Sequence, residues 1–351
     1  MDTMSRAVSL LVPACMFLAA CGPKGIGPGG GRAPARGTLH AAEPGEPAWP
    51  PEEPRIAFVH SFSTPEQLGI RPRLPERIVA LIAGRAERRL VRPMAVVVVA
   101  DIVYVADPGA KGVHRFDLAR RRYDLIRGGE PLPSPVGLAV GPGGSIYVAD
   151  SMLAAVFAID PRSTVARRVQ LREPLGQPTG LAFDPASQRL FVVDTADHRV
   201  KVFEKNGSLA FSFGGRGDGD GEFNYPTHLW RDSEGRLLVT DSLNFRIQVF
   251  DGSGGFLGKF GRNGNGAGEF ARPKGVAADR FGHVYVVDAL FHAVQVFDSA
   301  GQLLLRFGSQ GREPGEFWLP SGVCFAGGDT LYVADSYNQR IQIFRYVGSE
   351  P

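Results

Sequence analysis

Short stretches of alternating apolar and polar residues recur along the second half of the chain and predict β-strands. Successive side chains of a strand point to opposite faces, so a period of two is typical of a half-buried strand. Four stretches share this pattern: RVKVF (199–203), RIQVF (246–250), AVQVF (293–297) and RIQIF (340–344). Each follows an apolar run rich in β-branched and aromatic residues, which predicts a buried neighbouring strand.

A tetrapeptide that ends in aspartate recurs six times in step with these strands. Its six aspartates are Asp107, Asp150, Asp194, Asp241, Asp288 and Asp335. They are 43, 44, 47, 47 and 47 residues apart, a period typical of β-propeller blades with four strands each. A proline lies about 15 residues before each aspartate. Proline cannot donate to a strand ladder, so it should open the first strand of each blade.

The order of these motifs resembles the NHL repeat, in which P-x-G, YVAD, N-x-R-I-Q-V-F and a closing F-G strand follow one another. The resemblance implies an all-β fold, a six-bladed β-propeller with four-stranded antiparallel blades. The motifs are most regular in the last three blades, and the first two depart from them. The expected blades are residues 93–130, 135–173, 178–214, 226–261, 273–308 and 320–346.

The last blade has only three strands before the chain ends, so an N-terminal strand should close the ring within a propeller of residues 55–347. Two segments could supply it, RIAFVHSFS (55–63) and RIVALIAG (77–84). In the third to fifth blades the closing phenylalanine lies 13 residues before the next proline, and Phe62 lies 13 before Pro75. The spacing therefore favours 55–63 as the closing strand. Residues 75–84 are predicted to form a helical insertion, with proline in the first turn and glycine at the end.

The first 20 residues have the layout of a secretory signal peptide, with one arginine ahead of an apolar stretch. The stretch ends Leu18-Ala19-Ala20-Cys21, which resembles the lipobox of bacterial lipoproteins. The resemblance implies that Cys21 carries a lipid, including palmitate, and that the protein is anchored to the cell envelope, at the outer membrane. An ordinary signal peptide is the alternative. Residues 21–54 are rich in glycine and proline and predict a flexible tether.

The repeat aspartates are predicted to be structural, because six equivalent carboxylates in six blades are kept well apart. They should accept hydrogen bonds from turn amides or from the arginine five residues on, as in the pairs Asp194/Arg199, Asp241/Arg246 and Asp335/Arg340. His228 differs from the other histidines because it replaces the glycine of P-x-G in the fourth blade. It should line the central channel, but a single histidine does not make a metal site. No catalytic residue, metal or cofactor is predicted.

These features favour a binding function over an enzymatic one. The net charge of +3 gives no reason to expect nucleic acid as a partner. We expect a monomeric, membrane-tethered scaffold that binds an envelope protein or peptide. Arginines gather in residues 85–92 and 115–122. They could face lipid headgroups, acidic glycans or an acidic partner, but a solvated surface accounts for them better. The alternative is a metal-dependent lyase or hydrolase in the channel, since some similar propellers are zinc lyases.

Overall fold

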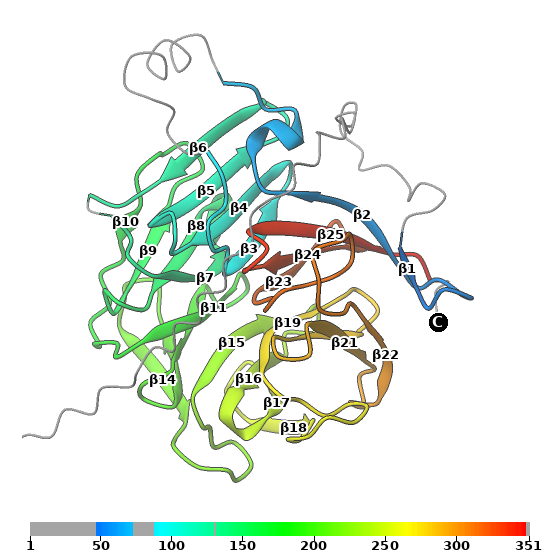
Figure 1. Cartoon of the computed structure of the whole chain (residues 1–351). Helices are drawn as coiled ribbons and strands as arrows, with labels where there is room; N and C mark the ends of the chain where they lie inside the picture. The colour runs from blue at the N-terminus through cyan, green and yellow to red at the C-terminus, as the bar shows by residue number, and fades with distance from the viewer. Residues whose placement is uncertain (1–46, 73–87, 130, 349–351) are drawn as a thin grey trace, which may run out of the picture. The chain divides into compact units, whose positions relative to one another are not determined.

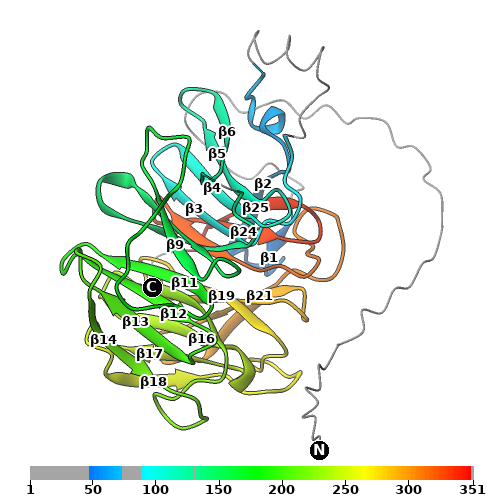
Figure 2. The same cartoon turned by 90° about the vertical axis from the view of Figure 1, so that its left-hand side faces the viewer.

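The computed structural model describes residues 47–72, 88–129 and 131–348. In this part of the chain, 25 strands form six antiparallel sheets. Five sheets have four strands and one has five. The sheets stand around a common axis, so that the chain passes from one blade to the next (Figures 1 and 2). The six-bladed propeller predicted from the repeat is therefore confirmed.

The first three blades are each built from strands that are consecutive in the chain. Blade one comprises β3 (Ala95–Val99), β4 (Ile102–Asp107), β5 (Gly112–Asp117) and β6 (Arg122–Ile126). Blade two comprises β7 (Pro135–Val140), β8 (Ile146–Asp150), β9 (Ala155–Ile159) and the two-residue β10 (Arg167–Arg168). Blade three comprises β11 (Pro178–Asp184), β12 (Arg189–Asp194), β13 (Arg199–Phe203) and β14 (Leu209–Gly214).

The last three blades follow the same plan until the ring closes. Blade four comprises β15 (Pro226–Arg231), β16 (Leu237–Asp241), β17 (Arg246–Phe250) and β18 (Phe256–Phe260). Blade five comprises β19 (Pro273–Ala278), β20 (Val284–Asp288), β21 (Ala293–Phe297) and β22 (Leu303–Phe307). Blade six comprises β23 (Val323–Ala326), β24 (Thr330–Asp335), β25 (Arg340–Tyr346), β2 (Ile56–Phe62) and β1 (Ala48–Trp49). Short 3₁₀ turns lie at Pro65–Leu68, Pro142–Gly144 and Ser242–Asn244.

The innermost strand of each blade begins where the repeat predicts a proline, with two exceptions. Pro135, Pro178, Pro226 and Pro273 are the first residues of their strands. In blades one and six the strand starts after the proline, at Ala95 and Val323. The prolines therefore mark the end of the propeller at which the chain enters each blade.

Neighbouring blades approach one another closely at the innermost strands, which explains the glycine of P-x-G. A Cβ atom added to Gly137 would lie 1.7 Å from the carbonyl oxygen of Thr179, and one added to Gly180 would lie 2.7 Å from the amide of Leu229. Backbone atoms cannot yield as a flexible side chain does, so these positions exclude larger residues. The buried apolar side chains form clusters between the blades, so that each blade depends on its neighbours.

In three blades, a hydroxyl group that follows the repeat aspartate links the blade to the next one. Thr195 Oγ1 donates to the carbonyl of Pro226 at 2.6 Å, and Ser242 Oγ donates to that of Pro273 at 3.2 Å. Ser336 Oγ donates to the carbonyl of Pro93 at 2.6 Å, which joins the last blade to the first. Because all of these groups are buried, their bonds resist sliding of the blades.

The ring closes by pairing the two ends of the propeller within blade six, as predicted. Strand β2 runs antiparallel to β25, with Ile56 opposite Tyr346 and Phe62 opposite Ile341. This blade has a fifth strand, however, because Ala48–Trp49 pair with Ile56 and Ala57. The prediction of four strands was wrong for this blade, and the end of the predicted tether, residues 21–54, already belongs to the sheet.

Several predicted features lie outside the described residues. They are the signal peptide (1–20), the lipidation site Cys21, the tether as far as residue 46 and the helical insertion at 75–84. Within the described residues, no helix is both long and apolar enough to span a bilayer. The lipid anchor therefore stays a prediction.

Candidate functional site

All six repeat aspartates are fully buried at the end of the propeller where the innermost strands begin. We call this end the Asp face; it comprises the turns after the six aspartates and the loops that lead to the six prolines. Each carboxylate accepts a hydrogen bond from a backbone amide just ahead of the proline. Asp194, for example, accepts from Gly176 and Gln177, both at 2.8 Å. The aspartates thus hold the loops of the Asp face in place.

The side-chain partners of these aspartates differ in part from the predicted arginines. Arg246 and Arg340 do lie 2.8 Å from Asp241 and Asp335, as predicted. In blade three the cation beside Asp194 is Lys201, at 3.0 Å, so the predicted pair with Arg199 is wrong. Lys201 stands seven residues after its aspartate, two further than Arg199, on the same face of the strand. From this position the ammonium group of Lys201 reaches the carboxylate of Asp194 directly.

The same seventh position supplies a buried partner in other blades as well. Gln248 and Gln342 donate to Asp241 and Asp335 at 3.1 Å each, and His114 lies 3.3 Å from Asp107. Burial alone would raise the pKa of Asp194, but its amide bonds and Lys201 outweigh burial and lower that pKa. Carboxylates that are enclosed and bonded in this way stabilise the fold.

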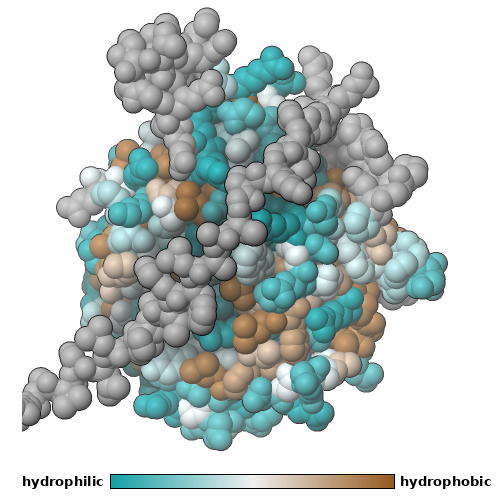
Figure 3. All heavy atoms as spheres, in the orientation of Figure 1, coloured by the Kyte–Doolittle hydropathy of each residue, from teal (hydrophilic) through white to brown (hydrophobic). Residues whose placement is uncertain are grey.

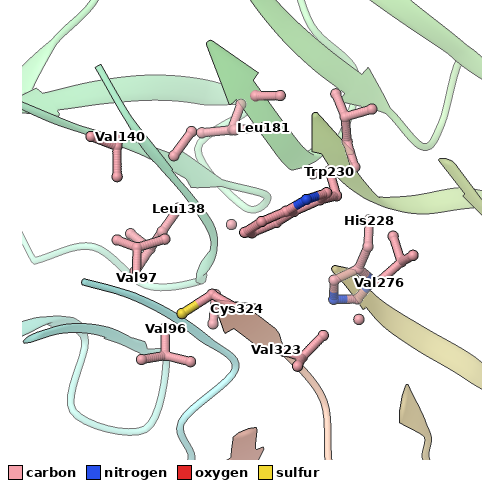
Figure 4. A pocket seen from close by; sticks show the side chains of 18 of the residues that line it. Val96, Val97, Leu138, Val140, Leu181, His228, Trp230, Val276, Val323 and Cys324 are labelled. Carbon is pink, nitrogen blue, oxygen red and sulfur yellow. The ribbon is translucent and has the colours of Figure 1, made fainter. Parts of the chain in front are cut away.

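A cavity of about 210 Å³ lies on the axis, enclosed by the innermost strands of all six blades. Figure 4 shows side chains from different blades pointing into it. The lining is mainly apolar and includes Val97, Leu138, Leu181, Val276 and Val323. Such a surface suits an apolar group better than a charged one.

Two residues of β15 interrupt this apolar lining. His228 lies on the innermost strand and lines the cavity, where five other blades carry a glycine or an alanine. Two residues on, Trp230 stands where the other blades have Val97, Ala139, Ala182, Ala277 and Cys324. Blade four therefore places two large side chains in the cavity two residues apart on one strand.

The indole ring of Trp230 reaches across the axis from β15. It packs against three apolar clusters, which hold Val276, Val323 and Cys324 respectively, and Figure 4 shows it crossing the middle of the cavity. Its Nε1 is buried without a hydrogen-bond partner among the described residues. Trp230 does not stand out in the sequence, because a tryptophan satisfies an apolar strand pattern as well as an alanine does. Comparing the fourth residue after each proline would have revealed it.

His228 is neutral at physiological pH. Burial, and then the positive charge of Lys274, lower the pKa of its imidazole to about 3. The Nδ1 atom lies 3.0 Å from Thr227 Oγ1, so the other ring nitrogen is left for contacts in the channel. In the described part of the chain, no three His, Cys, Asp or Glu side chains come together as a metal site would require. The group that His228 offers in the channel is therefore a neutral hydrogen-bonding one.

We expect His228 to make the protein less stable in acid. The unfolded chain binds a proton on this residue below a pKa of about 6.5, while the folded protein resists protonation until about pH 3. Stability should therefore fall as the pH drops below 6.5, by up to about 1.4 kcal/mol per unit from this residue. The free energy of unfolding, measured in urea between pH 7.5 and 4.5, should depend less steeply on pH in His228→Gln than in the unchanged protein. Parallel curves would contradict this assignment.

The model of the Teneurin NHL domain matches residues 126–316, more than half of the chain, and the NHL repeat matches residues 317–344. The chain belongs to the NHL propeller family. A stretch of 55 residues is 40% identical to the human E3 ubiquitin-protein ligase NHLRC1. This stretch makes up 16% of this chain and 14% of that protein. The chain thus matches only a small part of that relative's length.

Solved structures of diverse function share the fold of this NHL propeller. Virginiamycin B lyase from Staphylococcus aureus is 15% identical, with a TM-score of 0.54 over 73% of this chain and 96% of that one. An auxiliary nutrient binding protein from Bacteroides thetaiotaomicron is 11% identical, with a TM-score of 0.59 over 76% and 71%. Hydrazine synthase from Kuenenia stuttgartiensis is 13% identical, with a TM-score of 0.52 over 74% and 97%. At these identities the likeness concerns the fold alone.

Proposed function

We propose that this NHL propeller is a non-enzymatic binding module that docks a partner protein on its Asp face. The observation that carries the proposal is a set of exposed apolar side chains at equivalent turns of this face. The second residue after the repeat aspartate is Met152, Leu243, Leu290 or Tyr337 in four blades. These side chains are exposed to 73%, 41%, 55% and 56% respectively.

Nothing in the fold requires large apolar residues at these turns. The equivalent positions in the other two blades are Gly109 and Ala196, and the turns form there as well. Tyr225, exposed to 42%, adds a further ring just ahead of Pro226. Exposed apolar groups that recur on one surface are typical of protein interaction sites. Figure 3 shows hydrophobic residues gathered among hydrophilic ones in the lower half of that view.

Arginines on the same face favour a partner that carries acidic groups. Arg216, Arg272 and Arg312 are exposed in the loops that lead to the innermost strands. The guanidinium carbon of Arg312 lies 5.1 Å from the centre of the Trp318 ring, and the ring centres of Trp318 and Tyr337 are 6.3 Å apart. Arginine and aromatic residues together are enriched at the energetic centres of protein interfaces.

The arginines of residues 115–122 do not form a comparable surface. Arg115 is 4% exposed and lies 2.7 Å from Asp124, and Arg122 lies 2.9 Å from the same carboxylate. Arg120 lies 3.1 Å from Asp117. Since three of the four arginines have an acidic neighbour, the attraction for an acidic partner is weaker here than on the Asp face.

The proposal places this module in the bacterial envelope, held by a lipid on Cys21. The support is the motif Leu18-Ala19-Ala20-Cys21 and the glycine- and proline-rich segment after it. A tether of this composition would let the propeller reach its partner at a distance from the membrane. Labelling of the protein by a fatty-acid probe should be lost in Cys21→Ser, and labelling that persists would contradict the anchor.

The docking surface can be tested by recovering partners from solubilised membranes. A Leu290→Asp/Tyr337→Ser variant should lose the partner at least tenfold, because both side chains would lie inside the interface. A Leu257→Ser/Leu304→Ser variant is the matched control, since these leucines are as exposed but lie on outermost strands. A partner that both variants retain would refute the Asp face as its docking site. Stoichiometric zinc that depends on His228 would instead favour the alternative of a metal-dependent lyase or hydrolase.

A further inference from the structure

The residue after each proline forms a ring around the axis at the Asp face. We call this ring the axial mouth; its members come from six equivalent positions: Met94, Val136, Thr179, Thr227, Lys274 and Ser321. The ring lies one residue ahead of the glycine positions where neighbouring blades meet. It is therefore the entrance to the channel from the Asp face.

Two of the three hydroxyl groups in the axial mouth are paired with the residue that follows the repeat aspartate. Thr179 Oγ1 lies 2.8 Å from Thr195 Oγ1, and Thr227 Oγ1 lies 2.8 Å from Ser242 Oγ. Blade five lacks this pair, because it has Lys274 in the axial mouth and Ala289 after the aspartate. An alanine cannot accept a hydrogen bond from the lysine through its side chain.

Lys274 is half-buried and has no acidic neighbour in the described part of the chain. Among residues 47–72, 88–129 and 131–348, no carboxylate forms an ion pair with it. Burial, and then the charge of Arg272, lower the pKa of its ammonium group. A cation that is removed from water without a counter-charge costs free energy, which an anionic ligand would recover.

Ser321 offers a second free group beside this cation. It is 3% exposed, and its Oγ has no hydrogen-bond partner among the described residues. Its carbonyl oxygen accepts from the amide of Gly275 at 3.0 Å, which places it against the strand of Lys274. A buried hydroxyl without a partner is uncommon in a folded protein. Both unpaired groups therefore lie on adjacent strands of the same ring.

We propose that the axial mouth binds a carboxylate group between Lys274 and Ser321. The ammonium group would supply the opposite charge, the serine hydroxyl would donate a hydrogen bond, and the neutral ring of His228 lies on the inner side of the ring. One cation with neutral donors matches a carboxylate, which carries one charge, better than a phosphate dianion. The carboxylate could belong to a small organic acid or to the end of a polypeptide, and the two sources share this chemistry.

The proposal can be tested by titrating the full-length protein with N-acetylglycine in a calorimeter. We expect saturable binding that falls at least tenfold in Lys274→Met and about three- to tenfold in Ser321→Ala. The matched control is Lys259→Met, which removes an exposed lysine bound to Asp220 and should leave binding unchanged. N-acetylglycine amide should not bind, and phosphate should bind more weakly. If Lys274→Met fails to fold, Ser321→Ala provides the test.

Titrations with acetate and with peptides distinguish the two possible sources of the carboxylate. If N-acetylglycine and acetate bind alike, the site accepts small acids; if only peptides with a free C-terminus bind, it accepts a polypeptide end. Equal binding to the unchanged protein and to both mouth variants would overturn the proposal, as would no binding of any carboxylate. The test is independent of the proposed docking surface, because no partner protein takes part in it.

Discussion

Replacing Asp241 with alanine should lower the free energy of unfolding by about 3–5 kcal/mol, since it breaks a buried ion pair from one side. Asp241 is fully buried and Arg246 is 6% exposed. The carboxylate also accepts from the amide of Asn224 at 2.6 Å and from the side chain of Asn244 at 2.8 Å. Without it, a buried guanidinium and a loop amide of the Asp face would lose their partner.

Denaturant unfolding of this variant should be compared with that of Asp251→Ala. Asp251 also accepts hydrogen bonds from a turn, from the amides of Ser253 and Gly255, but it lies at the surface in the same blade. Its loss should cost about 1 kcal/mol or less, because water replaces the lost bonds. Equal costs for the two variants would show that the repeat aspartate is not the structural anchor inferred above.

Deleting residues 47–63 should leave the protein without a stable fold at 37 °C. The deletion removes Ile56, Phe58 and Phe62, which are 1%, 6% and 1% exposed. Burying each such side chain contributes about 1.5–3 kcal/mol, so their sum approaches the whole stability of an ordinary domain, about 5–15 kcal/mol. The deletion would also expose the edge of β25, a site for aggregation.

Addition of the deleted segment as a peptide provides the control for this experiment. A peptide of residues 47–63 should pair with β25 and restore the thermal transition, because strand addition re-forms the same ladder. The same peptide with Phe62→Ala should restore it less well, since Phe62 packs edge-on against Phe116 in blade one at 5.2 Å. A deletion variant that melts like the unchanged protein would contradict the importance of this closure.

The closing strand was predictable because it obeys the spacing of the repeat, whereas β1 was not. Phe62 lies as far from Pro75 as the other closing phenylalanines lie from their prolines. Strand β1 has only two residues, Ala48 and Trp49, in a segment rich in proline, and two residues have no period. The strand is held by contacts that only the fold reveals, with Trp49 lying 5.6 Å from Phe307 and 6.0 Å from Phe344.

Residues of the candidate site could be predicted from the sequence where they break the repeat. They could not be predicted where their residue type fits the repeat pattern. His228 stands out because a histidine replaces a glycine, and the structure places it on the lining of the cavity. Lys274 occupies a position that varies among blades, so only its lack of an acidic neighbour makes it unusual. The partner of Asp194 was misassigned because residues 199 and 201 point to the same side of one strand, and sequence alone does not tell which of them reaches the carboxylate.

The indole of Trp230 lies on the axis of this propeller, between the axial mouth and the opposite end. Its ring crosses the channel and packs against blades five, six and one. A group that enters past Lys274 meets the indole ring partway along the axis. A partner docked on the Asp face would cover this entrance, so it would slow the exchange of any group bound there.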